Sequence, residues 1–336
     1  MKTVSELKSK RIGDGGRPHD YALVMAYLNQ IEKDPNRKIY EIDPYVAVYQ
    51  LRDNIYGLFT HNCDYAGDIW MYLILGPEKA MLIDTAFGLG DTKALVDYLA
   101  DGREVIVVNT HPHPDHAYGN CRFDKVYCHK FAVPMLERQD EHLWDYLFDE
   151  NGNNIWLEFD REDLPVYKPY EIVPMEDGSV FQLGDGYEVE MKWVPGHASS
   201  HCMFLDKQAK ILFAGDGVCA HVSGEGTGKR PHDDYYMYNN LECYRRELRK
   251  LADRLDEFDS IFPAHFNGDL PADALIPAVL EACDAILDEG KFDLIEDFKT
   301  GDGSIVKRQY KYIRGFSLLG VVQQNQGVYI PDEFRE

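Results

Sequence analysis

The chain has 336 residues, of which 58 are acidic and 35 are basic, giving a formal net charge of −23, and 45% are hydrophobic. The hydrophobic share is sufficient for a packed core, and no stretch approaches the roughly 20 apolar residues of a membrane-spanning helix. A surface this acidic repels phosphate groups, which disfavours nucleic acid as a partner. The 7 scattered cysteines indicate buried thiols, not a disulfide framework.

The N-terminus carries Lys and Arg but lacks the apolar run of a secretory signal peptide. We therefore expect a cytoplasmic protein without a membrane segment, and we leave open whether it forms a homo-oligomer. We divide the chain into a polar lead-in (1–40), a catalytic domain (41–290) and a C-terminal extension (291–336). The lead-in contains a predicted helix around residues 20–32.

Strand and helix signals alternate through the first half of the catalytic domain. Asp91 is a plausible N-cap for a helix that runs to Leu99, and the β-branched run at 105–108 is typical of a strand buried on both faces. Turn sequences separate the other predicted strands, at 45–51, 55–60, 69–75 and 80–83.

Residues 134–174 form an insertion that is rich in aromatic and acidic side chains and lacks strand alternation. We interpret it as helical or irregular, and as either a lid over a pocket or a subunit interface. Further strands are predicted at 180–181, 187–194, 202–206, 211–214, 260–262, 309–313 and 328–330, and helices at 241–255 and 271–288. Two packed sheets with helices outside would accommodate this order.

The sharpest motif is Thr110-His111-Pro112-His113-Pro114-Asp115-His116, directly after the strand at 105–108. Imidazole and carboxylate groups suit Zn²⁺ and related ions. Alternate residues of an extended segment point the same way, so His111 and His113 can converge on one metal. Asp115 and His116 then face a neighbouring position.

This H-x-H-x-D-H pattern resembles the signature of the metallo-β-lactamase fold superfamily. The segments Leu82–Thr85, Pro195–His197, Phe213–Asp216 and Phe262–His265 resemble further motifs of the family and occur in its order. The resemblance spans residues 69 to 265 and implies an αββα four-layer sandwich. It points to the glyoxalase II/lactonase-like branch of the superfamily.

Carried over position by position, the resemblance implies two divalent metals per chain, with zinc expected and manganese or iron as alternatives. His111, His113 and His197 would hold the first metal. Asp115, His116 and His265 would hold the second, and Asp216 would bridge the two. Asp84 would support a ligating histidine, because such residues usually donate their other N–H to a carboxylate or a carbonyl.

Other residues are weaker candidates for the site. His201 lies four residues after His197 and is either a support for the ligands or an ordinary polar residue. His61 could line the mouth of the site. Tyr235, Tyr236 and Tyr238 could form a pocket wall or could simply pack. We place the other histidines, including His129, on the surface or in loops.

These features predict a dinuclear hydrolase of a small-molecule ester, lactone or thioester, acting through a metal-bridging hydroxide. Asp115 would be the catalytic residue that orients the hydroxide and takes up its proton. Three alternatives stay open: a phosphodiesterase, a mononuclear iron sulfur dioxygenase, and a metal-stabilised binding protein without turnover.

Overall fold

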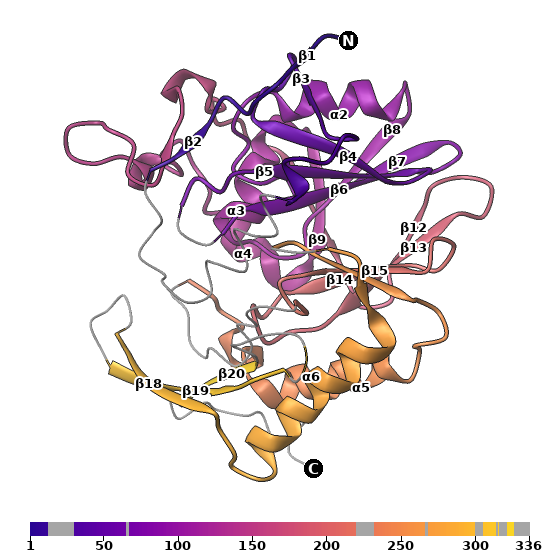
Figure 1. The fold of residues 1–336 in the computed structure, drawn as a ribbon, viewed down its shortest axis with the longest axis vertical. Helices are drawn as coiled ribbons and strands as arrows, with labels where there is room; N and C mark the ends of the chain where they lie inside the picture. The colour runs from indigo at the N-terminus through magenta and orange to yellow at the C-terminus, as the bar shows by residue number, and fades with distance from the viewer. Residues whose placement is uncertain are drawn as a thin grey trace. The chain divides into compact units, whose positions relative to one another are not determined.

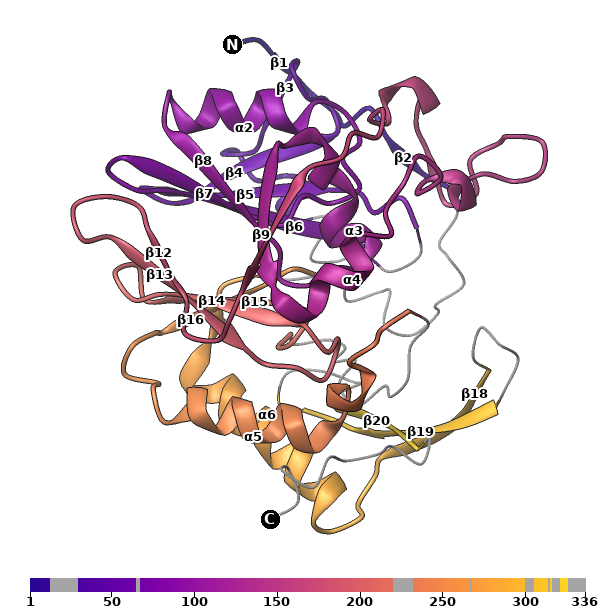
Figure 2. The same ribbon diagram turned by 180° about the vertical axis from the view of Figure 1, so that it is seen from behind.

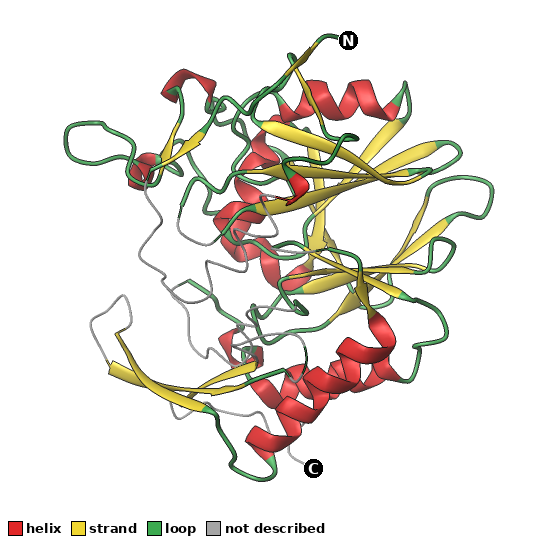
Figure 3. Cartoon of the chain, in the orientation of Figure 1, coloured by secondary structure: helices red, strands yellow, loops and turns green. Residues whose placement is uncertain are grey.

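The computed structural model describes residues 1–12, 30–64, 67–219, 232–265, 268–299, 305–313, 315 and 321–325. The chain divides into two compact units. Unit 1 comprises Met1–Cys128, Met135–Met175 and Phe181–Glu188; unit 2 comprises His129–Pro134, Glu176–Val180 and Val189–Glu336. Together they make an α/β protein with two mixed sheets (Figure 3). All seven cysteines are buried, which confirms the buried thiols predicted from composition.

The first sheet has nine strands in the order β1-β3-β4-β5-β6-β7-β8-β9-β11 (Figure 1). Its neighbours are antiparallel from β1 to β7, whereas β7, β8 and β9 run parallel. The strands are β1 (Thr3–Val4), β3 (Lys38–Tyr40), β4 (Val46–Arg52), β5 (Ile55–Thr60), β6 (Ile69–Leu75), β7 (Lys79–Ile83), β8 (Glu104–Val108), β9 (Lys125–His129) and β11 (Glu171–Met175).

The parallel pair β7 and β8 decides which residues meet at the edge of this sheet. Ile83 of β7 is in register with Val108 of β8, so the segments that follow both strands leave the sheet side by side. Helix α2 (Thr92–Ala100) connects the two strands and packs against both. The side chain of Asp91 accepts a hydrogen bond from Ala94 N at 3.1 Å, which confirms the predicted N-cap.

Buried aromatic side chains hold most of the insertion at 134–174 in unit 1. Trp144, Phe148 and Phe159 are buried in one cluster with Tyr45 and Phe87. The predicted absence of strands is wrong at two places, because β10 (Leu157–Glu158) pairs with β2 (Lys10–Arg11) and β11 joins the main sheet. The rest contains the short helices α4 (Val133–Leu136), η3 (Asp145–Leu147) and η4 (Arg161–Asp163). Unit 1 also contains α3 (Pro114–Ala117) and η1 (Tyr118–Arg122), which precede β9.

The second sheet has six strands in the order β12-β13-β14-β15-β16-β17. They are β12 (Val180–Gln182), β13 (Glu188–Trp193), β14 (Cys202–Asp206), β15 (Ile211–Gly215), β16 (Ser260–Pro263) and β17 (Leu270–Pro271). Strands β13, β14 and β15 are antiparallel neighbours and β15 runs parallel to β16, so β13, β15 and β16 all end at one edge. That edge carries the predicted ligands of unit 2.

Helices α5 (Leu241–Ala252) and α6 (Ala272–Leu287) pack together within unit 2 (Figure 2). Their apolar residues Leu248, Leu275 and Val279 share one buried core with Leu212 of β15 and Ile261 of β16. Helix α5 ends at Ala252, three residues before the predicted end at 255. Among the described residues, no helix is long and apolar enough to cross a membrane.

The C-terminal extension contains an antiparallel sheet of β18 (Leu294–Lys299), β19 (Ile305–Lys311) and β20 (Val321–Asn325). Strands β19 and β20 lie against α6. Only β19 was anticipated, and it begins four residues before the predicted 309–313. The strand predicted at 328–330 lies outside the described residues.

Candidate metal centre

The loop that follows β8 gathers four of the predicted ligands in unit 1. His111 and His116 have no exposed surface, and Asp115 is 4% exposed. Pro114 occupies the first position of the short helix α3, where its fixed φ angle favours a helical start. This helix places Asp115 and His116 one turn beyond His113, so all four side chains belong to one compact segment.

The two histidines before the helix present their ring nitrogens to each other. His111 Nε2 lies 2.9 Å from His113 Nδ1. The other ring nitrogen of His111 lies 3.0 Å from Thr110 Oγ1, so that contact occupies Nδ1 and leaves Nε2 directed at His113. The next two ligands form a second pair, with Asp115 Oδ1 3.7 Å from His116 Nε2.

Asp84, directly after β7, fixes the orientation of His116. Its Oδ2 lies 2.8 Å from His116 Nδ1, and it also accepts hydrogen bonds from the backbone N–H of Thr110 (2.7 Å) and from the Thr110 hydroxyl (2.8 Å). The backbone of Asp84 adopts φ of 63°, in the left-handed region that a β-carbon disfavours. A carboxylate held in this way keeps the proton of His116 on Nδ1, the tautomer in which Nε2 can bind a metal.

The other three predicted ligands follow the strands of unit 2 that end at one sheet edge. His197 comes after β13, Asp216 after β15 and His265 after β16. Asp216 Oδ2 lies 3.3 Å from His197 Nε2, and Asp216 Oδ1 lies 3.4 Å from His265 Nε2. The two oxygens of one carboxylate therefore face different imidazoles, as expected of a bridging ligand.

The donor chemistry of each unit fits a divalent metal. Two nitrogen or oxygen ligands on a tetrahedral zinc, at bond lengths of about 2.1 Å, lie about 3.4 Å apart. The pairs within unit 2 lie at 3.3 and 3.4 Å, and the pair of Asp115 and His116 lies at 3.7 Å. All seven residues belong to the groups of His and Asp, on the described part of the chain, that could hold a metal ion.

His201 contacts the backbone of this site with both of its ring nitrogens. Its Nδ1 donates to Val194 O at 3.1 Å, and its Nε2 accepts from the backbone N–H of Asp216 at 3.1 Å. This pairing of a donor with an acceptor describes a neutral imidazole that orients the segment carrying Asp216. His201 thus joins the backbone at Val194 to the backbone at Asp216.

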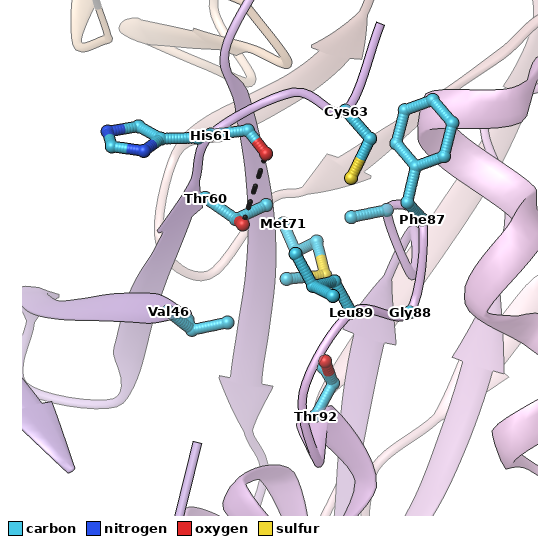
Figure 4. Close-up of a pocket in the computed structure, with 10 residues that line it drawn as sticks. Val46, Thr60, His61, Cys63, Met71, Phe87, Gly88, Leu89 and Thr92 are labelled. Carbon is cyan, nitrogen blue, oxygen red and sulfur yellow. Dashed lines mark hydrogen bonds between the residues drawn. The ribbon is translucent and has the colours of Figure 1, made fainter. Parts of the chain in front are cut away.

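His61 is buried, and its Nδ1 lies 3.0 Å from the hydroxyl oxygen of Ser9. Burial lowers the pKa of its imidazole to about 4. A small pocket lies beside its backbone, and Figure 4 shows the ring pointing away from Cys63 and Met71, which also line that pocket. The structure therefore places the imidazole of His61 in the interior of unit 1.

The three tyrosines belong to an aromatic cluster of unit 2. Tyr235 and Tyr238 both stack on Phe131, with ring centroids 4.1 and 5.2 Å apart, and Tyr236 begins the short helix η5 (Tyr236–Tyr238). The cluster includes His129, which stacks on Trp193 at 5.5 Å. His129 is buried at the end of β9 and burial lowers its pKa to about 4, so the surface or loop position expected for it is wrong.

The sequence interpretation missed a buried polar network beneath the motif. Asn109 Nδ2 donates to His116 O at 3.1 Å, and the backbone N–H of Thr85 donates to the same carbonyl at 2.9 Å. Asn120 joins both residues, because its Oδ1 accepts from Asn109 and from Thr85. An amide directly after a buried strand was the one signal that could have indicated Asn109.

Residues 64–265 match the family model described as Metallo-beta-lactamase superfamily. The chain belongs to the metallo-β-lactamase superfamily and has its fold, an α/β fold with two mixed sheets. Among solved structures, it resembles the metallo-beta-lactamase family protein TTHA1429 from Thermus thermophilus, with a TM-score of 0.52 and 23% identity. That comparison covers 74% of this chain and 85% of the other.

Two curated relatives have thioesterase names. The chain is 28% identical over 221 residues to the human "Acyl-coenzyme A thioesterase MBLAC2". The match covers 60% of this chain and 73% of the relative. It is 28% identical over 182 residues to "Atrochrysone carboxyl ACP thioesterase dmxR1" of Cryptosporiopsis sp. (strain 8999), covering 53% of this chain and 46% of the relative. The chain is thus a superfamily hydrolase with distant thioesterase relatives and candidate metal-binding His and Asp groups.

Proposed function

We propose that the chain is a dinuclear metal-dependent thioesterase that hydrolyses a small-molecule acyl thioester. The observation that carries the proposal is the Asp216 carboxylate, whose two oxygens face His197 and His265 separately. A carboxylate whose two oxygens face different imidazoles is suited to binding two metal ions at once, as in a two-metal hydrolase. The thioesterase names of the distant relatives favour a thioester over an oxygen ester or a lactone.

In this proposal the seven predicted ligands bind two divalent metal ions, with zinc expected. His111, His113 and His197 would hold one, Asp115, His116 and His265 the other, and Asp216 both. The bound ions would supply Lewis acidity and lower the pKa of a bound water. The branch within the superfamily, resembling glyoxalase II and the lactonases, is part of the proposal, as is a cytoplasmic location.

The chain's own side chains would prepare the site for hydrolysis of the C–S bond to a carboxylic acid and a thiol. Asp84 keeps the proton of His116 on Nδ1, so Nε2 is available as a ligand. His201 accepts the backbone N–H of Asp216 and so fixes the segment that carries the bridging carboxylate. Asp115 would accept the proton of the attacking water at its carboxylate.

The test combines metal analysis with a matched substrate panel. Protein purified without chelator should contain two metals per chain, and Asp216→Ala should lose at least one metal together with turnover. The panel is an acyl thioester, the oxygen ester and lactone of the same chain length, and a chromogenic phosphodiester. We expect the highest kcat/KM for the thioester.

Three results would overturn the proposal in different ways. A single iron with oxygen consumption in the presence of a persulfide would identify a sulfur dioxygenase. Highest activity on the phosphodiester would identify a phosphodiesterase. Two metals without turnover of any substrate would indicate a metal-stabilised binding protein.

A further inference from the structure

Asn62, two residues after β5, contacts the Asp115 carboxylate directly. It is 5% exposed, and its Nδ2 donates hydrogen bonds to Asp115 Oδ2 (3.1 Å) and to the Gly67 carbonyl (2.7 Å). Its Oδ1 accepts from the backbone N–H of Asp64 at 2.9 Å. The amide orientation follows from these partners, because the nitrogen faces two acceptors and the oxygen faces a donor.

The N-terminal segment holds Asn62 in place from the other side. The backbone N–H of Asn62 donates to Asp68 Oδ1 at 3.1 Å, and Asp68 Oδ2 forms an ion pair with the guanidinium of Arg11 in β2. The residues before Arg11 and Asn62 also contact other segments. Lys10 of β2 pairs with Glu158 of β10, and His61 contacts the side chain of Ser9. A continuous series of contacts therefore leads from Arg11 through Asp68 and Asn62 to Asp115.

We propose that Asn62 is a positioning residue for Asp115, and that the pair of Arg11 and Asp68 fixes Asn62. A short carboxylate side chain rotates freely about its last bond unless one of its oxygens is held. Asn62 holds Oδ2, so Oδ1 stays turned toward His116 Nε2, 3.7 Å away. A neutral amide does this without adding another negative charge beside the ligands.

Two of these residues lie outside the part of the chain that the family model matches. That match begins at residue 64, whereas Arg11 and Asn62 precede it. Sequence reasoning placed Arg11 in a separate lead-in, but the lead-in contributes to the support of a predicted ligand. The inference rests on the proposed function only in treating Asp115 as a metal ligand.

The chain offers a matched control at the opposite end of β5. Asn54 is also a turn asparagine whose Nδ2 donates two hydrogen bonds, to Leu75 O (3.1 Å) and to the Tyr187 hydroxyl (3.0 Å). A six-residue strand separates Asn54 from Asn62, which places them roughly 20 Å apart at about 3.3 Å per residue. Asn62→Leu therefore removes two hydrogen bonds donated by a side-chain amide beside Asp115, and Asn54→Leu removes two similar hydrogen bonds far from it.

The experiment measures zinc affinity by chelator competition, thermal unfolding of the metal-free protein, and kcat and KM. Both variants should lower the unfolding temperature of the metal-free protein. Only Asn62→Leu should raise the dissociation constant of one of the two zinc ions, by about 10- to 100-fold, the range known for changes beside metal ligands. The kcat of Asn62→Leu should fall while KM changes little, because the substitution disturbs a predicted metal ligand and not a residue that contacts the substrate. Arg11→Gln should weaken zinc binding in the same direction but less.

The outcomes separate this inference from the proposed function. Wild-type zinc affinity in Asn62→Leu, or an equal loss in Asn54→Leu, would overturn the positioning role. An Asp115→Ala variant with the zinc content of the wild type would overturn it as well. If Asn62→Leu fails to fold, Asn62→Ser, whose hydroxyl is too short to reach Asp115, is measured in its place. A chain that shows the Asn62-dependent zinc affinity but hydrolyses no thioester refutes the proposed function and leaves the inference intact.

Discussion

Asp43, between β3 and β4, is a fully buried carboxyl group in unit 1. It accepts hydrogen bonds from the backbone N–H of Tyr45 at 3.1 Å and from the side chain of Thr92. Its Oδ2 has no hydrogen-bond partner among the described residues. Burial raises the pKa of Asp43 to about 7, although both hydrogen bonds and the charge of Arg122 oppose the shift. We expect Asp43→Asn to remove a strongly pH-dependent cost to stability.

The sign follows from where the proton is bound more tightly. Below the ordinary pKa of 3.8 the carboxyl is protonated in both the folded and the unfolded chain, so burial costs nothing through ionisation. Between pH 3.8 and about 7 the unfolded chain releases the proton while the folded chain keeps it, so stability falls as pH rises. At about 1.4 kcal/mol per pH unit, the full cost above pH 7 is on the order of 4 kcal/mol.

The assay is denaturant unfolding of metal-free wild type and Asp43→Asn at pH 4 and pH 8. Removing the metals keeps ligand binding out of the comparison. The free energy of unfolding of the variant, relative to wild type, should rise by up to about 4 kcal/mol between the two pH values. Asp97→Asn, the same change beside Lys93 on the exposed face of α2, controls for the substitution itself. A difference that stays constant within about 1 kcal/mol from pH 4 to pH 8 would refute the reasoning.

Three further predictions concern single contacts. Asp84→Asn replaces the carboxylate that holds His116, so zinc affinity measured by chelator competition should fall about 10- to 100-fold, and unchanged affinity would exclude that role. Leu248→Ala opens a cavity in the core of unit 2 and should cost about 2–5 kcal/mol in denaturant unfolding, whereas a cost below about 1 kcal/mol would contradict the packing. Trp144→Phe keeps most of the buried area but leaves the Phe87 carbonyl without its donor, so unfolding should require about 1–3 kcal/mol less, and a neutral effect would show that water replaces the bond.

The sequence predicted best those elements whose pattern is set by burial alone. β5 and β6 have the predicted bounds, and α2 and β8 differ from prediction by a residue at an end, because continuous apolar runs and an N-cap are local signals. β9 and β18 were missed, since Lys125–His129 is short and Leu294–Lys299 carries three charged residues. Such strands are stabilised by pairing with neighbours, and pairing is not visible in a local pattern.

Residue types and their order indicated the candidate ligands, together with Asp84 and His201 beside them, but not Asn109 or Asn62. Two histidines with a carboxylate in a short loop predict a metal regardless of the surrounding fold. Asn109 and His201 act through backbone carbonyl and amide groups, and Asn62 acts across a separation of 53 residues. Contacts of this kind depend on the tertiary structure, and an asparagine has no spacing that would indicate them.

The insertion shows how an interpretation based on composition differs from one based on packing. Exposed aromatic side chains would suit a lid, but Trp144, Phe148 and Phe159 are interior residues of unit 1. Trp144 Nε1 donates to Phe87 O at 3.1 Å. Phe87 lies three residues after Asp84, on the segment that follows β7. Because Asp84 in turn fixes His116, the insertion stabilises the segment on which the ligand orientation depends. Trp144 therefore supports the segment that carries Asp84 from within the core, as the N-terminal segment supports Asp115 through Asn62.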